Sequence, residues 1–293
     1  MSPDATPLNP GGIVRWRMGL IQHKREAYWF YRFLSLGYDR WVNPLFWTPA
    51  MRSRALDAAR FDDPRLETLD VGAGTGFTTE GIVERVDPTR VTMLDQSPHQ
   101  LARARRKPAL QACRKLLGDA ERLPFDDDAF DRYVSAGSIE YWPDPQRGIA
   151  EAYRVLRPGG TGVVIGPVRP ANPLLRRLSQ AWMLFPGEDE YRLWFERAGF
   201  ADIEVHVLAP DWYRGRSPYG VAVAGTKPAP GPSPIASAAP AVVEDRATPL
   251  SGVERLRFAG RFVLGSAAGA AFVPIGVVLS LRARLARLRG QTP

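Results

Sequence analysis

Glycines and acidic residues come together in three short segments between residues 69 and 125. The first, LDVGAGTG at 69–76, carries Asp70, Gly72, Gly74 and Gly76 directly after the start of an apolar strand. Glycines let a backbone turn tightly and approach a ligand where a Cβ would obstruct it. A Gly-x-Gly-x-Gly run is shared by dinucleotide and nucleoside sites. Its spacing to the acids that follow therefore decides which chemistry the loop serves.

Two acids follow at the spacing of a nucleoside-binding unit. A strand predicted over 90–94 ends at Asp95, which is followed by Gln96, roughly twenty residues after the glycine loop. A carboxylate at such a strand end can accept both hydrogen bonds of a ribose diol. A third strand is expected to end at Asp119 and Ala120, where the acid is placed to hold an adenine amino group.

The elements that must position these residues alternate short apolar runs with helical patterns over 47–228. This alternation is typical of βαβ units around a mostly parallel sheet. A helix is expected from Phe77 to Val86. Ser97 and Pro98 predict another helix start, because a serine cap and a first-turn proline both favour one. Further strands are expected at 131–135, 161–166, 202–208 and 219–226.

Two more motifs complete a recognisable order. The strand-ending Asp95 is followed by GDAERLPF at 118–125 and RVLRPGG at 154–160. With LDVGAGTG, this order resembles the class I S-adenosylmethionine-dependent methyltransferases over residues 66–228. The resemblance implies an α/β fold with a doubly wound, seven-stranded Rossmann-like sheet whose last strand runs antiparallel. A dehydrogenase would need Gly-x-Gly-x-x-Gly and a nicotinamide partner domain, and the sequence has neither.

The resemblance also implies the cofactor, S-adenosylmethionine, and the residues that bind it. Each residue taken singly is equally well explained as a turn glycine or a surface acid, but their order and spacing together favour the cofactor site. No metal is expected, because the three histidines are scattered and there is one cysteine. The expected set comprises Asp70, Gly72, Gly74 and Gly76 at the methionine end, Asp95 and Gln96 at the ribose, Asp119 and Ala120 at the adenine, and Ser135 in the fourth strand.

The segment after the fourth strand limits what can be methylated. It reads SAGSIEYW over 135–142. Methyltransferases of planar amino groups often carry an Asn/Asp-Pro-Pro-aromatic run at this place, so the segment argues against a nucleic-acid substrate. The net charge of +8 is concentrated partly in arginines that bracket an apolar C-terminal run, which favours a membrane partner over nucleic acid.

A closer resemblance runs from about residue 20 to the C-terminus. It rests on QHKREAYWFYRFLS (22–35), LDQSPHQLA (94–102), VSAGSIEYWPDPQRGIAEAYRVL (134–156), WMLFP (182–186) and WYRG (212–215). These segments are similar to the methyltransferase family of plastoquinone and tocopherol synthesis. The resemblance implies C-methylation of a membrane-resident 2-methyl-6-polyprenyl-1,4-benzoquinol. The alternatives are another lipid substrate, such as a menaquinol precursor, a sterol or a phospholipid headgroup, or a non-enzymatic membrane adaptor.

A quinol ring carbon attacks a methyl group well only after a ring hydroxyl loses its proton, so a base is expected near the substrate. The candidates are His23, Glu140 and Tyr141. His23 lies in the expected N-terminal cap and has a suitable intrinsic pKa. Glu140 follows the fourth strand at the end of the sheet that faces the pocket. A surface role for His23 and a helix-capping role for Glu140 remain the alternatives.

Aromatic side chains are dense in the segments expected around the substrate. Such side chains can line an apolar pocket or lie at a lipid interface. Core packing is the alternative for each of them. The predicted substrate-binding residues are Tyr28, Trp29, Tyr31, Trp142 and Trp182.

Four parts are predicted along the chain: a leader with an aromatic cap helix (1–46), the methyltransferase domain (47–228), a Pro/Ala-rich linker (229–250) and a membrane anchor with a basic tail (251–293). Residues 262–281 carry no charge, and about twenty helical residues span a bilayer. Gly265 and Gly269 would allow two such helices to form a homodimer. A buried C-terminal helix, or one lying on the membrane surface, is the alternative.

The N-terminus is polar, with no apolar segment behind a basic start, and predicts no secretory signal. It also lacks the features of an organelle transit peptide, which favours a prokaryotic protein with its catalytic domain facing the cytoplasm. For a plastid homologue, the resemblance implies the inner envelope.

Overall fold

The computed structural model of the chain describes residues 47–213 and 217–235, with part of a helical segment between 252 and 281. The predicted leader lies outside the described residues. The roles predicted for His23, Tyr28, Trp29 and Tyr31 therefore stay predictions.

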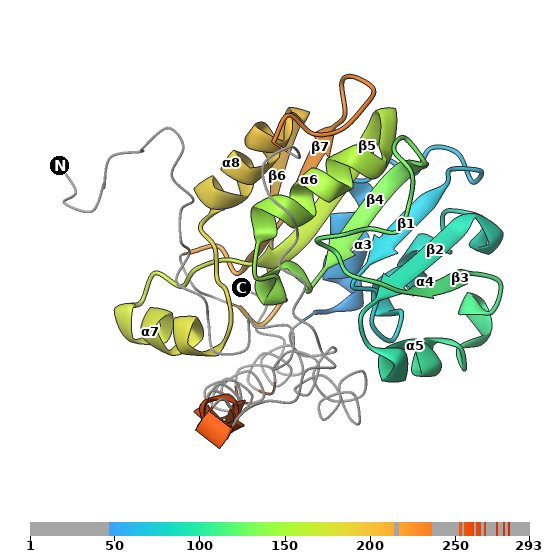
Figure 1. The fold of residues 1–293 in the computed structure, drawn as a ribbon. Helices are drawn as coiled ribbons and strands as arrows, with labels where there is room; N and C mark the ends of the chain where they lie inside the picture. Colours follow the sequence, from blue (N-terminus) through green and yellow to red (C-terminus); the bar gives the residue numbers. More distant parts are fainter. Residues whose placement is uncertain are drawn as a thin grey trace, which may run out of the picture.

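A single seven-stranded sheet forms the centre of the described part, in the order β3-β2-β1-β4-β5-β7-β6 (Figure 1). β1 to β5 pair in parallel, whereas β7 pairs antiparallel with both β5 and β6. The predicted doubly wound sheet with an antiparallel last strand is therefore confirmed. The strands are β1 (Thr68–Val71), β2 (Val91–Asp95), β3 (Arg114–Leu117), β4 (Phe130–Ala136), β5 (Leu156–Pro167), β6 (Ala201–Leu208) and β7 (Gly220–Thr226).

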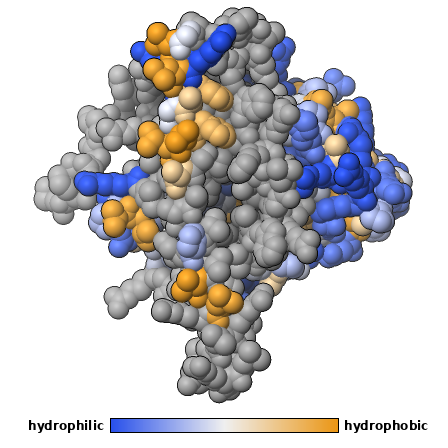
Figure 2. Space-filling model, turned by 90° about the horizontal axis from the view of Figure 1, so that it is seen from below, coloured by the Kyte–Doolittle hydropathy of each residue, from blue (hydrophilic) through white to orange (hydrophobic). Residues whose placement is uncertain are grey.

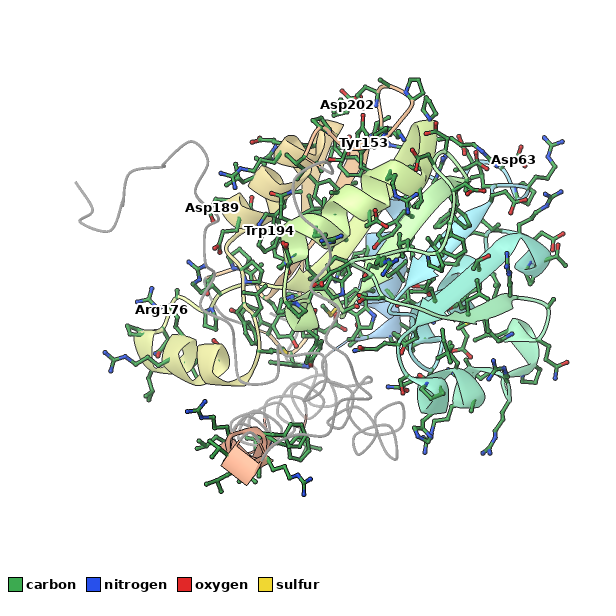
Figure 3. The ribbon with its side chains drawn as sticks, viewed as in Figure 1. Asp63, Tyr153, Arg176, Asp189, Trp194 and Asp202 are labelled. Carbon is green, nitrogen blue, oxygen red and sulfur yellow. The ribbon has the colours of Figure 1, made fainter. Side chains whose placement is uncertain are left out.

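Helices cover both faces of this sheet. α6 and α8 pack on one face through Tyr153, Tyr191 and Trp194, among others, and Trp194 is fully buried (Figure 3). α3, α4 and α5 pack on the other face, with Leu56, Ile82 and other apolar residues in its core. The helices are α3 (Pro49–Asp57), α4 (Phe77–Ile82), α5 (Pro98–Ala104), α6 (Pro145–Val155), α7 (Pro173–Trp182) and α8 (Glu188–Ala198), with 3₁₀ turns η2 (Pro88–Arg90), η3 (Pro108–Leu110) and η4 (Ile139–Tyr141).

The strands follow the burial rules for this architecture. Every residue of β1 and β2 is buried, as expected for parallel strands covered on both faces. β3 lies at the sheet edge and carries charged residues there. The central strands therefore provide a rigid frame whose carboxyl ends hold the loops described below.

Two helix predictions have different outcomes. The Ser97 side chain caps α5 by accepting a hydrogen bond from the backbone N–H of Gln100, and Pro98 occupies the first turn, as expected. The helix predicted over Phe77 to Val86 was too long, because α4 ends at Ile82 and the chain continues in turns. Its sequence FTTEGI contains two threonines and a glycine, which are weak helix formers.

The segment after β7 packs on the domain before the predicted linker leaves it. Lys227 is fully buried, and its Nζ donates to Asp128 Oδ1 at 2.6 Å and to the Gly231 carbonyl at 2.7 Å. Ser233 is also buried and donates to the Ala198 carbonyl at 2.9 Å. Residues 229–235 of the predicted linker are thus part of the folded unit, while 236–250 lie outside the described residues.

No helix in the described part of the chain is both long and apolar enough to cross a membrane. Most of the span predicted over 262–281 lies outside that part. The membrane anchor and its dimer contact therefore stay predictions.

Candidate active site

The carboxyl ends of β1, β2 and β4 meet at one edge of the sheet, where ligands of doubly wound folds bind. Three loops follow these ends: the glycine loop after Val71, the turn after Asp95, and the segment from Gly137 into η4. The backbone N–H groups of Gly72 and Ala73 both donate to the Leu94 carbonyl, at 2.8 and 3.1 Å. The glycine loop is thereby fixed against β2.

The three glycines of the loop all have positive φ, at 69°, 57° and 86° for Gly72, Gly74 and Gly76. This conformation is costly for residues with a Cβ. Among the described residues, a Cβ on Gly74 would meet only the Gly72 carbonyl oxygen, at 3.9 Å, so space is open beside Gly74 in this part of the chain. A Cβ on Gly72 would instead lie 2.2 Å from Ser138 Oγ. The loop therefore leaves a cradle at Gly74 and touches the loop after β4 at Gly72.

Asp70 lies beneath the glycine loop and is fully buried. Its Oδ2 accepts a hydrogen bond from Thr79 Oγ1 at 2.6 Å, while its Oδ1 has no partner among the described residues. Burial raises the pKa of this carboxyl to about 7; the hydrogen bond from Thr79 opposes this shift and the nearby charge of Asp95 adds to it. A cation bound close to the pair would favour the ionised form of Asp70.

Asp95 ends β2 and holds the two loops beside it. Its Oδ2 accepts from the Gly74 N–H at 2.9 Å and its Oδ1 from the Ser97 N–H at 2.7 Å. Burial raises its pKa to about 6, although both hydrogen bonds lower it. Each carboxylate oxygen has a second lone pair for a further donor. Gln96, the next residue, is half-buried.

The predicted adenine-binding residues follow β3. Asp119 and Ala120 are half-buried, and Asp119 Oδ1 accepts from the Glu121 N–H at 3.0 Å. Ser135 lies within β4 with its side chain fully buried, and its predicted role stays a prediction.

These residues fit S-adenosylmethionine on three observations. The loop has an open cradle beside Gly74. Asp95, at the end of β2, can accept further hydrogen bonds. Asp70 has a buried oxygen, Oδ1, without a partner among the described residues. Burial raises the pKa of both carboxyls, and a cationic ligand would stabilise their ionised forms. For each individual residue, cofactor binding remains a proposal. The proposed residues are Asp70, Gly72, Gly74, Gly76, Asp95, Gln96, Asp119, Ala120 and Ser135.

Glu140 lies in η4, directly after the end of β4, and is 6% exposed. Its Oε2 has no hydrogen-bond partner among the described residues. Burial raises the pKa of this carboxyl to about 8. In turn, the Glu140 charge adds to burial in raising the pKa of Tyr191, whose hydroxyl donates to the Pro167 carbonyl at 3.1 Å. A buried carboxyl at this edge of the sheet, with one oxygen that has no partner among the described residues, is suited to proton transfer.

The aromatic residues near Glu140 have core positions. Tyr141 is buried in the same turn. Trp142 is 5% exposed, its Nε1 donates to Ser138 Oγ at 2.9 Å, and a Cβ on Gly148 of α6 would be 2.5 Å from its ring. Trp142 therefore packs in the core, and its predicted contact with substrate stays a prediction. Trp182 ends α7, and its side chain lies outside the described part of the structure.

Ser138 is the site residue that sequence reasoning missed. It links three elements, because its Oγ lies against Gly72, accepts from Trp142, and precedes Glu140 by two residues. Its position within the segment 135–142 was a weak signal. Its contact with Gly72 depends on the parallel pairing of β1 with β4.

The fold and this site define the class: the protein is an S-adenosylmethionine-dependent methyltransferase. A methyltransferase-domain family profile matches residues 69–164. A solved putative methyltransferase, in complex with the Haloferax volcanii Trm112 activator, superposes with a TM-score of 0.57 at 23% identity, covering 70% of this chain and 97% of that one. Geranyl diphosphate C-methyltransferase from Streptomyces coelicolor, solved with S-adenosyl-L-homocysteine, superposes with a TM-score of 0.51 at 19% identity, covering 61% of this chain and 77% of that one.

The sequence relatives are more specific. The chloroplastic 2-methyl-6-phytyl-1,4-hydroquinone methyltransferase of Arabidopsis thaliana is 52% identical over 89% of this chain and 78% of its own length. Its rice counterpart is 52% identical over 89% of this chain and 75% of its own length. The chain therefore belongs to the family of 2-methyl-6-phytyl-1,4-hydroquinone methyltransferases.

Proposed function

We propose that the enzyme methylates a ring carbon of a 2-methyl-6-polyprenyl-1,4-benzoquinol. The observation that carries this proposal is the 52% identity to a 2-methyl-6-phytyl-1,4-hydroquinone methyltransferase over 89% of the chain. The identity extends well beyond the 69–164 core that methyltransferases in general share. The similarity therefore includes most of the chain outside that core.

When bound, S-adenosylmethionine supplies an electrophilic sulfonium methyl group. The ring carbon becomes a competent nucleophile when the neighbouring hydroxyl loses its proton. Our candidate for the proton acceptor is Glu140, because its carboxyl is buried at the carboxyl edge of β4 with an unpartnered oxygen. Its pKa of about 8 is close to that of a phenol, about 10. Proton transfer from the quinol hydroxyl to Glu140 is therefore less unfavourable than transfer to an ordinary carboxylate.

The remaining polar residues position the reactants. Asp95 would hold the ribose through its open acceptor sites, and Asp119 with Ala120 would contact the adenine. Gly74 leaves room for the methionine end beside Asp70. Because Ser138 contacts Gly72 and lies two residues before Glu140, it couples the position of the cofactor loop to that of the base. Much of the catalysis would come from such positioning.

The membrane-related features complete the proposal. The aromatic cap residues Tyr28, Trp29 and Tyr31 would cover the prenyl tail, and Trp182 would lie close to it. His23 and Tyr141 are the alternative candidates for the base. The span 262–281 would anchor the enzyme to a membrane and allow a homodimer. The plant relatives are named as chloroplastic, so the plastid inner envelope is the proposed location for a plastid protein and the cytoplasmic membrane face for a prokaryotic one.

The test is a radiolabelled methyl-transfer assay with the full chain in detergent. The substrates are 2-methyl-6-solanesyl-benzoquinol and its phytyl analogue, with Asp95→Ala as the inactive control. Label on the quinols, lost in the control, is expected, and the ratio between them gives the preferred tail. An enzyme that binds the cofactor and labels neither quinol would contradict the proposal.

A demethylmenaquinol is the second candidate substrate. A demethylmenaquinone methyltransferase of Chlorobaculum tepidum is 36% identical, but over 50% of this chain and 56% of its own length. Adding this quinol to the same assay separates the two. Label on it alone would keep the reaction class and change the substrate.

A further inference from the structure

Helix α7 projects from the active-site side of the sheet. It follows the carboxyl end of β5 and begins at Pro173, where the Asn172 side chain accepts from two backbone N–H groups. Figure 1 shows it apart from the two helical layers, at the lower left. Leu174, in its first turn, is 75% exposed. A large apolar side chain this exposed, on a helix at the mouth of a site, suggests an interaction surface.

The charge of α7 is entirely positive. Its sequence PLLRRLSQAW has no acidic residue, and Arg176 and Arg177 are both exposed. Figure 3 shows Arg176 extending from α7 away from the sheet. Arg177 lies three residues from Leu174 and so shares its face of the helix. Arg176, two residues from Leu174, lies on a different face. An arginine beside an exposed leucine, on a helix without acidic residues, matches the headgroup layer of an anionic bilayer.

A second set of exposed apolar side chains lies on the same side of the molecule. The described residues of the C-terminal helical segment include Val253, Leu256, Val263 and Leu264, each more than 60% exposed. Figure 1 shows this segment below the sheet, as α7 is, and Figure 2, which views this side, shows apolar residues among those described. Two separate elements thus present apolar side chains beside the carboxyl edge of the sheet.

We propose that α7 lies in the headgroup layer of an anionic phospholipid bilayer, so that the active-site edge faces the membrane. Leu174 enters the layer and Arg176 and Arg177 contact lipid phosphates. This inference rests on the proposed function, because a polyprenyl quinol resides in the bilayer and has to reach the site from it. The surface itself is defined by α7 and is separate from the residues that bind cofactor or transfer protons.

An environment-sensitive fluorophore tests the contact without using turnover. Leu174→Cys and Arg65→Cys are each labelled with a nitrobenzoxadiazole maleimide in the full chain. Arg65 is the control, because its side chain is 81% exposed but it precedes β1, at the amino edge of the sheet, opposite the active-site edge. The unsubstituted protein, treated with the same maleimide, gives the background labelling, since its one cysteine, Cys113, is buried. Vesicles contain phosphatidylcholine alone or with phosphatidylglycerol.

The label at 174 is expected to brighten and shift to the blue on the mixed vesicles, with a smaller change on phosphatidylcholine alone and none at 65. Arg176→Glu with Arg177→Glu should abolish the preference for phosphatidylglycerol. Equal spectra at 174 and 65, or no response at 174 when the protein co-floats with vesicles, would overturn the proposal.

The same variants distinguish failure of this surface from failure of the proposed function. Leu174→Asp should raise the KM for a vesicle-embedded quinol several-fold and leave the kcat unchanged, whereas Arg65→Asp, at the opposite edge of the sheet, should change neither. A response at 174 without methyl transfer to any quinol would sink the proposed substrate and keep the surface. Methyl transfer with an unchanged KM in Leu174→Asp would remove the surface and keep the substrate.

Discussion

The Ser138 hydroxyl occupies the place where a side chain on Gly72 would begin. A Cβ on Gly72 would lie 2.2 Å from Ser138 Oγ and 2.4 Å from Ser138 Cβ. The same hydroxyl accepts a hydrogen bond from the buried Trp142 indole at 2.9 Å, so it cannot move away cheaply. The cofactor loop and the turn that carries Glu140 are therefore in direct contact.

Gly72→Ala should lower the free energy of unfolding by more than the cost of placing an alanine in a left-handed conformation. A left-handed conformation costs an alanine about 1–2 kcal/mol, and the overlap with Ser138 should add about 1–3 kcal/mol. Gly159→Ala is the matched control, because Gly159 has a φ of 79° and no atom of the described residues lies within 4 Å of its Cβ position. Thermal unfolding should give Gly72→Ala the lower Tm. Equal Tm losses would refute the contact.

Gly74→Ala should separate cofactor binding from folding. A Cβ there meets only a carbonyl oxygen at 3.9 Å, so its folding cost should match that of Gly159→Ala. The added methyl would enter the space assigned to the methionine end and weaken binding at least tenfold, or about 1.4 kcal/mol. Calorimetric titration with S-adenosylhomocysteine measures this. Unchanged affinity in Gly74→Ala would place the cofactor elsewhere.

Glu140→Gln tests the base. The kcat should fall about 10²–10⁴-fold, with cofactor affinity unchanged. In wild type, kcat/KM should rise with pH to an apparent pKa near 8, since the ionised carboxylate is the acceptor, and this rise should vanish in the variant. Tyr141→Phe should retain the wild-type profile. If Tyr141→Phe lost activity and Glu140→Gln kept it, the base would be reassigned.

Glu140 should also leave a signature in stability. Its pKa is raised by burial from 4.5 to about 8, so the folded state holds a proton that the unfolded chain releases between these values. The free energy of unfolding should therefore fall as the pH rises through this window. Glu140→Gln removes this contribution and should show a shallower decline in urea denaturation. Parallel curves for the two proteins would mean that the carboxyl is not buried as described.

Asp128→Asn should destabilise the enzyme with little effect on catalysis. Lys227 is fully buried and Asp128 is its carboxylate partner at 2.6 Å. Asparagine, like aspartate, adopts the positive φ of 58° at this position more readily than most residues do. Two carbonyl partners remain, so a loss of about 1–3 kcal/mol is expected. Unfolding and kinetics on one preparation decide this, and a large fall in kcat with unchanged stability would contradict it.

The sequence predicts the structure correctly at positions where the local pattern and the tertiary contacts favour the same conformation. The glycine loop, Asp95 and the Ser97 cap were located correctly because strand ends, turns and helix starts have strong local signals. The antiparallel last strand came from the family resemblance. No periodicity in β7 predicts its direction, which depends on the whole sheet.

Other features depend on contacts that the sequence does not display. Composition predicted a linker from 229, yet Ser233 is buried because its hydroxyl reaches the Ala198 carbonyl across 35 positions. The packing of Trp142 against Gly148 of α6 likewise has no signal in the sequence around it. The burial of Glu140, which sets its pKa, likewise arises from the packing of η4 against the rest of the domain.

The most direct test of the central claim is the position of the new methyl group. Full-length enzyme is incubated with 2-methyl-6-solanesyl-benzoquinol and S-adenosylmethionine carrying a ¹³C-labelled methyl group, and the product is examined by carbon NMR. An aryl methyl signal on the ring carbon beside a hydroxyl, absent with Asp95→Ala, is the expected result. A methoxy signal, or no labelled quinol while the cofactor binds, would contradict carbon methylation of a prenyl-benzoquinol.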